Sequence, residues 1–159
     1  VTQKESSAEE MLRNAGLDAD GETMRAARAV EEAKLRLAMM HKLSQSRMPE
    51  FQRAIADFEA QMIPLLDDIL KNPSTRRRAN NLMRRTMPRL FEAVETYVKY
   101  ADEGTDLVDP TEMRKRVIAA LRTAGQQAEQ TRLDGLESTE QGVEIALEIL
   151  EGSFAFSKH

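Results

Sequence analysis

The chain has 159 residues, a formal net charge of −4, 31% charged residues and 4% aromatic residues. This length suits one domain with a sizeable core, and the negative charge argues against a general nucleic-acid-binding protein. The lack of cysteine excludes disulfides and thiolate sites, and no apolar run is long enough to span a membrane. Helix-forming residues dominate, which predicts an all-α protein.

Residues 1–21 are predicted to be weakly ordered, residues 22–152 to form a helical bundle, and residues 153–159 to form a loose tail. Apolar side chains recur every three or four residues over 22–44, which is typical of an amphipathic helix. The sequence SQSRMP ends it. A second stripe runs from Phe51 to Ile69 and contains Pro64. The sequence NPST follows as a stop, and Ser74 or Thr75 is expected to cap the next helix.

A third long helix is expected over residues 75–102, with a kink at Pro88. Its apolar stripe comprises Ala79, Met83, Met87, Leu90, Val94 and Tyr97. Asp109 and Pro110 are expected to cap and begin another helix, interrupted over 133–138 before a last helix. Strand signals do not occur. We therefore predict an antiparallel helical bundle of five to six helices, some long, one kinked at Pro88. The spacing also suits a coiled coil between chains, so a homo-oligomer is an open alternative.

Six arginines lie between residues 76 and 89, in the first half of this third helix. On a helical wheel, five of them form two rows opposite the apolar stripe: Arg77 and Arg84 in one, and Arg78, Arg85 and Arg89 in the other. We predict that these five arginines bind a partner or an anion, because like charges stacked along a helix are unfavourable without acidic neighbours.

Two interpretations of the arginine rows remain open. The first is ion pairing within the chain, to the carboxylates of the preceding helix: Asp57, Glu59, Asp67 and Asp68. The second is an anionic partner, either an acidic protein surface or an anionic membrane surface. Nucleic acid is disfavoured as that partner, because no aromatic residue lies among the arginines to stack on bases.

Residues suited to catalysis are few. The two histidines are His41 and the final residue, His159, and the sequence has no paired-histidine, EF-hand, P-loop or glycine-rich dinucleotide motif. Asp67 and Asp68 are adjacent, so a helix points them about 100° apart. Three other acids share one helical face, which a solvated surface explains: Glu144, Glu148 and Glu151. We therefore predict no catalytic residue, no metal site and no cofactor.

The arginine segment also carries a family likeness. Residues 69–102 contain the Asn72-Pro73 step, arginines in the following turn, the Met87-Pro88 step and an apolar stripe that reaches Tyr97. These features resemble the central segment of the bacterial XpaC family, labelled 5-bromo-4-chloroindolyl phosphate hydrolysis proteins. Residues 136–150 are similar to the closing helix of that family, and the likeness covers roughly residues 50–152. One departure is Arg84-Arg85-Thr86, where the family tends to have aromatic residues.

The resemblance implies a helical bacterial protein, often tethered to the membrane by an N-terminal segment and often associated with TelA-type toxic-anion-resistance proteins. We accordingly expect a non-enzymatic interaction module of a bacterial envelope or stress-resistance system, whose arginine face docks an acidic partner such as a TelA-like protein. The expected location is the bacterial cytoplasm or the cytoplasmic face of the membrane, with an N-terminal anchor in a longer gene product. The alternatives are a phosphate-ester hydrolase and a protein that binds anionic lipid.

Overall fold

The computed structural model describes residues 10, 13, 21–103, 109–137, 144, 147, 148 and 150–152. Its elements, in chain order, are α2 (Gly21–Ser44), α3 (Pro49–Lys71), α4 (Pro73–Arg78), the π-helix η1 (Leu82–Thr86), α5 (Met87–Glu103) and α6 (Pro110–Glu137). No strand occurs among the described residues. The expectations for residues 1–20 and 153–159, and for the start of a last helix over 138–143, lie outside them, apart from Glu10 and Arg13.

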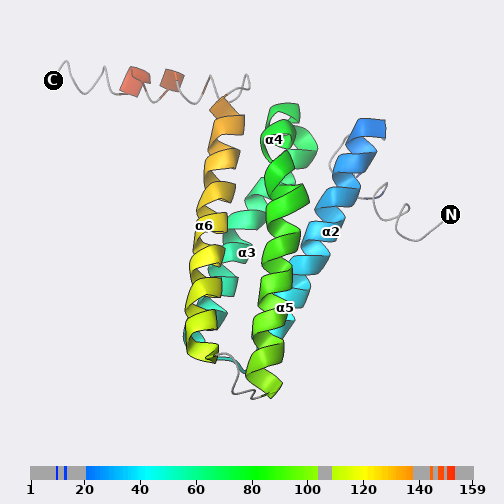
Figure 1. Cartoon of the computed structure of the whole chain (residues 1–159). Coiled ribbons are helices and arrows are strands. Elements are labelled where there is room, and N and C mark those ends of the chain that lie inside the picture. The colour runs from blue at the N-terminus through cyan, green and yellow to red at the C-terminus, as the bar shows by residue number, and fades with distance from the viewer. Residues whose placement is uncertain are drawn as a thin grey trace.

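Four long helices, α2, α3, α5 and α6, lie side by side in the described part of the chain (Figure 1). Helix α2 packs against α3, and α5 packs against α6. In addition, α2 contacts α5, and α3 contacts α6. Thus α3 and α5 occupy opposite corners, and the short α4 crosses one end of the bundle between them, in contact with α6. The predicted all-α helical bundle is confirmed.

The core is built from the predicted three-and-four stripes of these helices. Its largest fully buried side chains are Phe51, Phe58, Met40, Ile55, Met62, Leu65, Leu66, Met87 and Leu121. The Phe51 ring packs on Tyr97, with ring centroids 5.0 Å apart and planes tilted by 58°. Such a tilted pair is a favourable arrangement of two aromatic rings. It joins the start of α3 to α5 in a core otherwise made almost wholly of aliphatic and methionine side chains.

The turn between α3 and α4 is capped by Asn72, not by Ser74 or Thr75 as expected. The Ser74 backbone N–H donates to Asn72 Oδ1 at 3.0 Å, and Pro73 takes the first helical position, where its missing N–H costs nothing. The other end of the Asn72 amide donates from Nδ2 to Gly135 O, 3.1 Å away on α6. At the start of α6 the prediction is confirmed: Asp109 caps and Pro110 begins the helix.

The predicted interruption over residues 133–138 is wrong as far as the structure describes it, because α6 continues through Glu137. The interruption was predicted because Gly135 lies in this stretch. A Cβ atom at Gly135 would lie 2.0 Å from Thr75 Oγ1 and 3.0 Å from Thr75 Cα. The glycine therefore serves close packing of α4 on α6, and Thr75, fully buried, donates from Oγ1 to Asp68 Oδ2 at 2.6 Å.

The predicted third helix is divided by a π-turn immediately before Pro88. The Met87 backbone N–H donates to Leu82 O, five residues back, instead of to the carbonyl four residues back. A proline in a regular helix lacks its N–H and its ring collides with the carbonyl four residues earlier. One wide turn relieves that collision. The turn also changes the buried stripe: Leu82 is buried in place of the expected Met83, which is half-buried.

Candidate anion-binding surfaces

The carboxylates of α3 do not neutralise the arginine segment. Asp67 lies 4.0 Å from Lys34, Glu59 lies 3.7 Å from His41, and Asp68 accepts the hydrogen bond from Thr75. Among the described residues, no carboxylate lies within 4.0 Å of the five predicted site arginines: Arg77, Arg78, Arg84, Arg85 and Arg89. Of the two interpretations left open by the sequence, ion pairing to α3 is therefore not what the structure shows.

Arg76 has a structural role that sets it apart from the other arginines of the segment. Its side chain is 16% exposed, and it donates from Nε to Ile69 O and from Nη2 to Leu70 O, both at 3.3 Å. These are carbonyls of the last turn of α3, which lack helical donors. Its Nη1 also lies 3.7 Å from Glu22 of α2. Arg76 thus closes α3 and links it to α2.

Arg77 and Arg84 line a pocket between α2 and the segment formed by α4 and η1. Its volume is about 620 Å³. From α2 it is lined by Glu22, Arg25, Ala26 and Ala29, and from the other side by Ile69, Arg76, Arg77, Asn80, Met83 and Arg84. The first predicted row of arginines is therefore brought together in one cavity, joined by two more guanidinium groups that the sequence did not single out.

Arg85 and Arg89, from the second predicted row, line a groove between α5 and α6. Its upper part, about 440 Å³, has Leu90, Ala93, Ala120 and Ala124 along its floor. A second cavity of about 500 Å³ shares Ala93 and Ala120 with it and extends the groove toward the start of α6. The third member of the row, Arg78, lines neither cavity and lies near Ser74, with Nε 3.4 Å from Ser74 Oγ.

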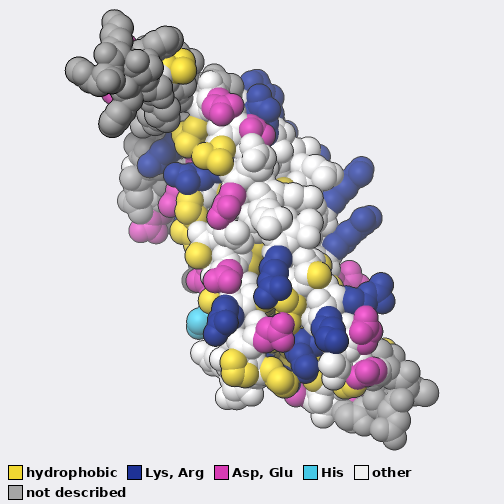
Figure 2. Space-filling view, turned by 90° about the vertical axis from the view of Figure 1, so that its left-hand side faces the viewer, with side chains coloured by type: hydrophobic (Ala, Val, Ile, Leu, Met, Phe, Trp, Pro, Cys, Tyr) yellow, Lys and Arg dark blue, Asp and Glu magenta, His cyan; other side chains and the backbone are white. Residues whose placement is uncertain are grey.

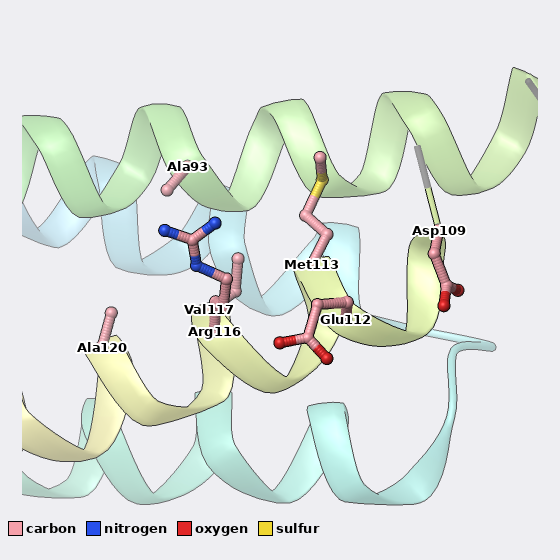
Figure 3. A pocket seen from close by; sticks show the side chains of 7 residues that line it. All are labelled: Ala93, Asp109, Glu112, Met113, Arg116, Val117 and Ala120. Atoms are coloured by element: carbon pink, nitrogen blue, oxygen red, sulfur yellow. The ribbon is translucent and has the colours of Figure 1, made fainter. Parts of the chain in front are cut away.

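Arg116 is a groove residue that sequence reasoning missed. In Figure 3 its guanidinium and the Met113 side chain rise from α6 toward α5, whereas the carboxylates of Glu112 and Asp109 turn away from α5. Within the described part of the chain, Arg116 has no carboxylate within 4.0 Å. The sequence does not indicate that Arg116 belongs to this groove, because Arg116 is far from the arginine segment in sequence and only the packing of α6 on α5 brings it there.

The α5–α6 groove is therefore apolar along its floor, with Arg85, Arg89 and Arg116 on its rim and Asp109 and Glu112 at the end near the start of α6. Ala124 and Leu90 are buried, Ala120 is exposed, and Arg85, Arg89 and Arg116 are exposed. The face in Figure 2 shows basic and acidic side chains scattered among hydrophobic ones. In the groove, three arginines that have no carboxylate within 4.0 Å among the described residues border one apolar floor.

The residues considered for catalysis remain dispersed over the described part of the chain. His41 is exposed and pairs loosely with Glu59, and Glu144, Glu148 and Glu151 are exposed as predicted. No group of three or more histidine, aspartate or glutamate side chains comes together there in a way that could hold a metal ion. None of the helices described has both the length and the apolar content needed to cross a bilayer.

Comparison with known proteins adds no relative. No protein-family model matches the chain, and neither a curated protein nor a solved structure matches it. The resemblance to the XpaC family rests on the sequence features given above and stays a prediction.

Proposed function

We propose that the chain is a non-enzymatic helical interaction module that docks an acidic partner protein in the groove between α5 and α6. The proposal rests on the three arginines at the rim of the groove. Arg85, Arg89 and Arg116 lie beside an apolar floor, and none of them has a carboxylate within 4.0 Å among the described residues. Unpaired cations next to exposed apolar surface fit a partner that brings both acid and hydrophobic side chains.

The shape of the groove suits an acidic amphipathic helix as the ligand. Its floor on α6 runs from Met113 to Ala124, which at 1.5 Å per residue is roughly 17 Å, or about three helical turns. The small side chains Ala93, Ala120 and Ala124 allow another helix to approach closely. A partner helix would lay apolar side chains on this track and direct glutamates to the arginines on the rim.

The biological setting of the proposal comes from the resemblance to the XpaC family. That resemblance supports a proposed setting in a bacterial envelope or toxic-anion-resistance system, in the cytoplasm or on the cytoplasmic face of the membrane. A TelA-like protein is then the proposed source of the acidic helix. A homo-oligomer is the alternative source, and sedimentation of the purified chain separates the two.

Fluorescence anisotropy with a labelled model peptide tests the proposal. The probe is a 15-residue helix with leucine at every third and fourth position and glutamate on the flanks, and the matched peptide carries lysine in place of glutamate. We expect saturable binding of the acidic peptide only. Arg85→Glu with Arg89→Glu should weaken it at least tenfold, because each rim charge then repels the ligand.

The matched control is Arg77→Glu with Arg84→Glu, which makes the same charge change on the other side of the segment and should leave peptide binding within about twofold. Equal binding of the acidic and basic peptides, or equal losses in the two double variants, would contradict docking in the groove. Hydrolysis of an aryl phosphate that is lost on Arg84→Ala or Arg85→Ala would instead favour the alternative, a phosphate-ester hydrolase.

A further inference from the structure

The net negative charge of the chain is concentrated in one short segment after α6. Residues 140–151 read EQGVEIALEILE and hold four glutamates but no lysine or arginine. The whole chain has 27 acidic and 23 basic residues, so without these four glutamates it would be neutral. The segment is therefore the most acidic complement to a basic surface that this chain contains.

The same segment has an apolar side. On a helical wheel its four glutamates fall within an arc of about 80°, and its valine, isoleucine, alanine and leucine residues fill the opposite side. The structure describes part of this segment, and the described residues are helical and exposed: Glu144, Leu147, Glu148, Leu150 and Glu151. Leu147 is 51% exposed and Leu150 is 54% exposed, so two large apolar side chains lie uncovered next to the glutamates.

These features are the ones that the α5–α6 groove is suited to bind. The groove has an apolar floor that includes Ala120 and Ala124, and Arg85 and Arg89 on its rim have no carboxylate within 4.0 Å among the described residues. An acidic amphipathic helix, which is the ligand proposed for the groove, is thus encoded in the chain itself. Exposed apolar surface and complementary charge are present on both sides of this potential contact.

The segment is long enough to reach the groove. The upper part of the groove, at Ala124, lies roughly 20 Å from Glu137 along α6 at 1.5 Å per residue. The linker of residues 138–142 spans up to about 20 Å when extended, so a chain that turns back along α6 brings the start of a helix to this level. A helix over 143–151 is about 13 Å long. It would end before Glu112, and therefore clear of the acidic end of the groove.

We infer that residues 140–151 dock into the upper α5–α6 groove of their own chain and compete there with the partner helix. This inference rests on the proposed function, since it assigns an internal competitor to the same site. The apolar side of the segment covers the floor, and its glutamates face Arg85 and Arg89. A short flexible linker gives a tethered ligand an effective concentration in the millimolar range, so a weak contact is sufficient to fill the groove. The structure, with Leu147 and Leu150 exposed, is the open arrangement.

Paramagnetic relaxation tests where the segment lies in the full chain. The sequence has no cysteine, so Gly152→Cys introduces a single site for a nitroxide, and a side chain there meets no atom within 4 Å. We expect broadening of the backbone amide signals of Ala120 and Ala124 in the groove, and none at Ala38 of α2. A mixture of isotope-labelled chain without nitroxide and unlabelled chain with nitroxide should show no broadening. Broadening in that mixture would overturn the inference, because the segment would then dock on a second copy.

The acidic model peptide tests the competition. Leu147→Ser with Leu150→Ser should remove the broadening and bind the peptide about tenfold more tightly than wild type, the factor expected if the segment fills the groove in about nine of ten molecules. Leu35→Ser with Leu133→Ser is the matched control, since it makes the same change at two exposed leucines outside the groove. Its affinity for the peptide should stay within about twofold of wild type.

The outcomes separate this inference from the proposed function. If the groove amides are not broadened, or if wild type and the Leu147 and Leu150 double variant bind the peptide equally, the inference is wrong and peptide docking in the groove still stands. If neither chain binds the peptide, the proposed function is contradicted, and the broadening alone then decides whether the segment lies in the groove.

Discussion

Arg47 and Asp102 join the turn after α2 to the last turn of α5 by two hydrogen bonds across 55 residues of sequence. Nη1 donates to Asp102 Oδ1 at 2.5 Å and Nη2 donates to Oδ2 at 2.8 Å. The same guanidinium donates from Nε to Leu43 O at 3.3 Å, a carbonyl in the last turn of α2. One side chain therefore closes a helix and holds it to a second helix at the end of the bundle that is opposite to α4.

This pair predicts a pH-dependent contribution to stability. Hydrogen bonds from Arg47 hold the pKa of Asp102 below its usual value, and desolvation opposes them only in part. A lowered pKa in the fold means that the contact stabilises above the pKa of the unfolded carboxyl, about 3.9, and is lost as pH falls through the folded pKa. Asp102→Asn should therefore unfold at a slightly lower urea concentration than wild type at pH 7, and the difference should shrink as pH falls below about 3.9 and through the lower pKa of the folded carboxyl. Glu103→Gln is the matched control: it removes the neighbouring carboxylate, which accepts neither of the two Arg47 hydrogen bonds, and should leave the urea midpoint at pH 7 unchanged.

Asn72 is predicted to be among the most sensitive polar residues of the fold. Asn72→Ala removes the cap of α4 and leaves the Gly135 carbonyl without this donor, which together should cost about 2 kcal/mol of unfolding free energy. Asn72→Asp keeps the cap but turns an acceptor toward that carbonyl, so it should destabilise as well. Chemical denaturation measures both. Asn81→Ala, at an exposed position nearby, should stay within about 0.5 kcal/mol of wild type.

Gly135→Ala is predicted to destabilise the protein although alanine is the better helix former. The added Cβ would lie 2.0 Å from Thr75 Oγ1 and 3.0 Å from Thr75 Cα, so α4 must move away from α6. Overpacking of this kind costs about 1–3 kcal/mol. Gly21→Ala is the control, since a Cβ there meets no atom within 4 Å. A thermal midpoint of Gly135→Ala at or above that of wild type would show that the close approach of the two helices is not needed.

Pro64 and Pro88 are predicted to differ in how much each lowers the unfolding free energy. Pro64 lies inside the continuous helix α3, where its ring faces a regular turn, whereas Pro88 follows the π-turn. Pro64→Ala should raise the unfolding free energy by about 1–3 kcal/mol, because it restores a backbone hydrogen bond and removes a clash. Pro88→Ala should change it by less than about 1 kcal/mol, because the π-turn already removes the collision. Urea denaturation of both variants checks the order, and equal gains would contradict it.

Much of the fold could be predicted because the helices are amphipathic and their ends carry local signals. The spacing of apolar residues gave α2 and α3 to within a few residues, and Asp109 with Pro110 gave the start of α6. Two errors have one cause. The sequence predicts neither the cap at Asn72 nor the close contact at Gly135, and both serve the packing of α4 on α6. A contact between residues 63 positions apart leaves no periodic signal in either segment.

The sequence predicted that the arginines of the segment fall into two rows, but it did not predict the cavities that they line or the presence of Arg25 and Arg116 in those cavities. The helical wheel separated Arg77 and Arg84 from Arg85 and Arg89, and the structure places these pairs in different cavities. The neutralising role considered for Asp67 could not be judged from sequence. It depends on how α3 is rotated, and that rotation turns Asp67 toward Lys34 of α2.

The π-turn also constrains how the arginine segment can change over time. Successive buried residues are three or four positions apart along this segment, except for the step of five from Leu82 to Met87. Deleting one residue inside that step would restore an ordinary turn, and Pro88 would then collide with it. If the proline is lost and no residue is deleted, the helix keeps the additional residue of the wide turn although no proline ring needs the space. An aligned relative that lacks proline at this position should therefore also carry a one-residue gap, so the two features are expected to be inherited together.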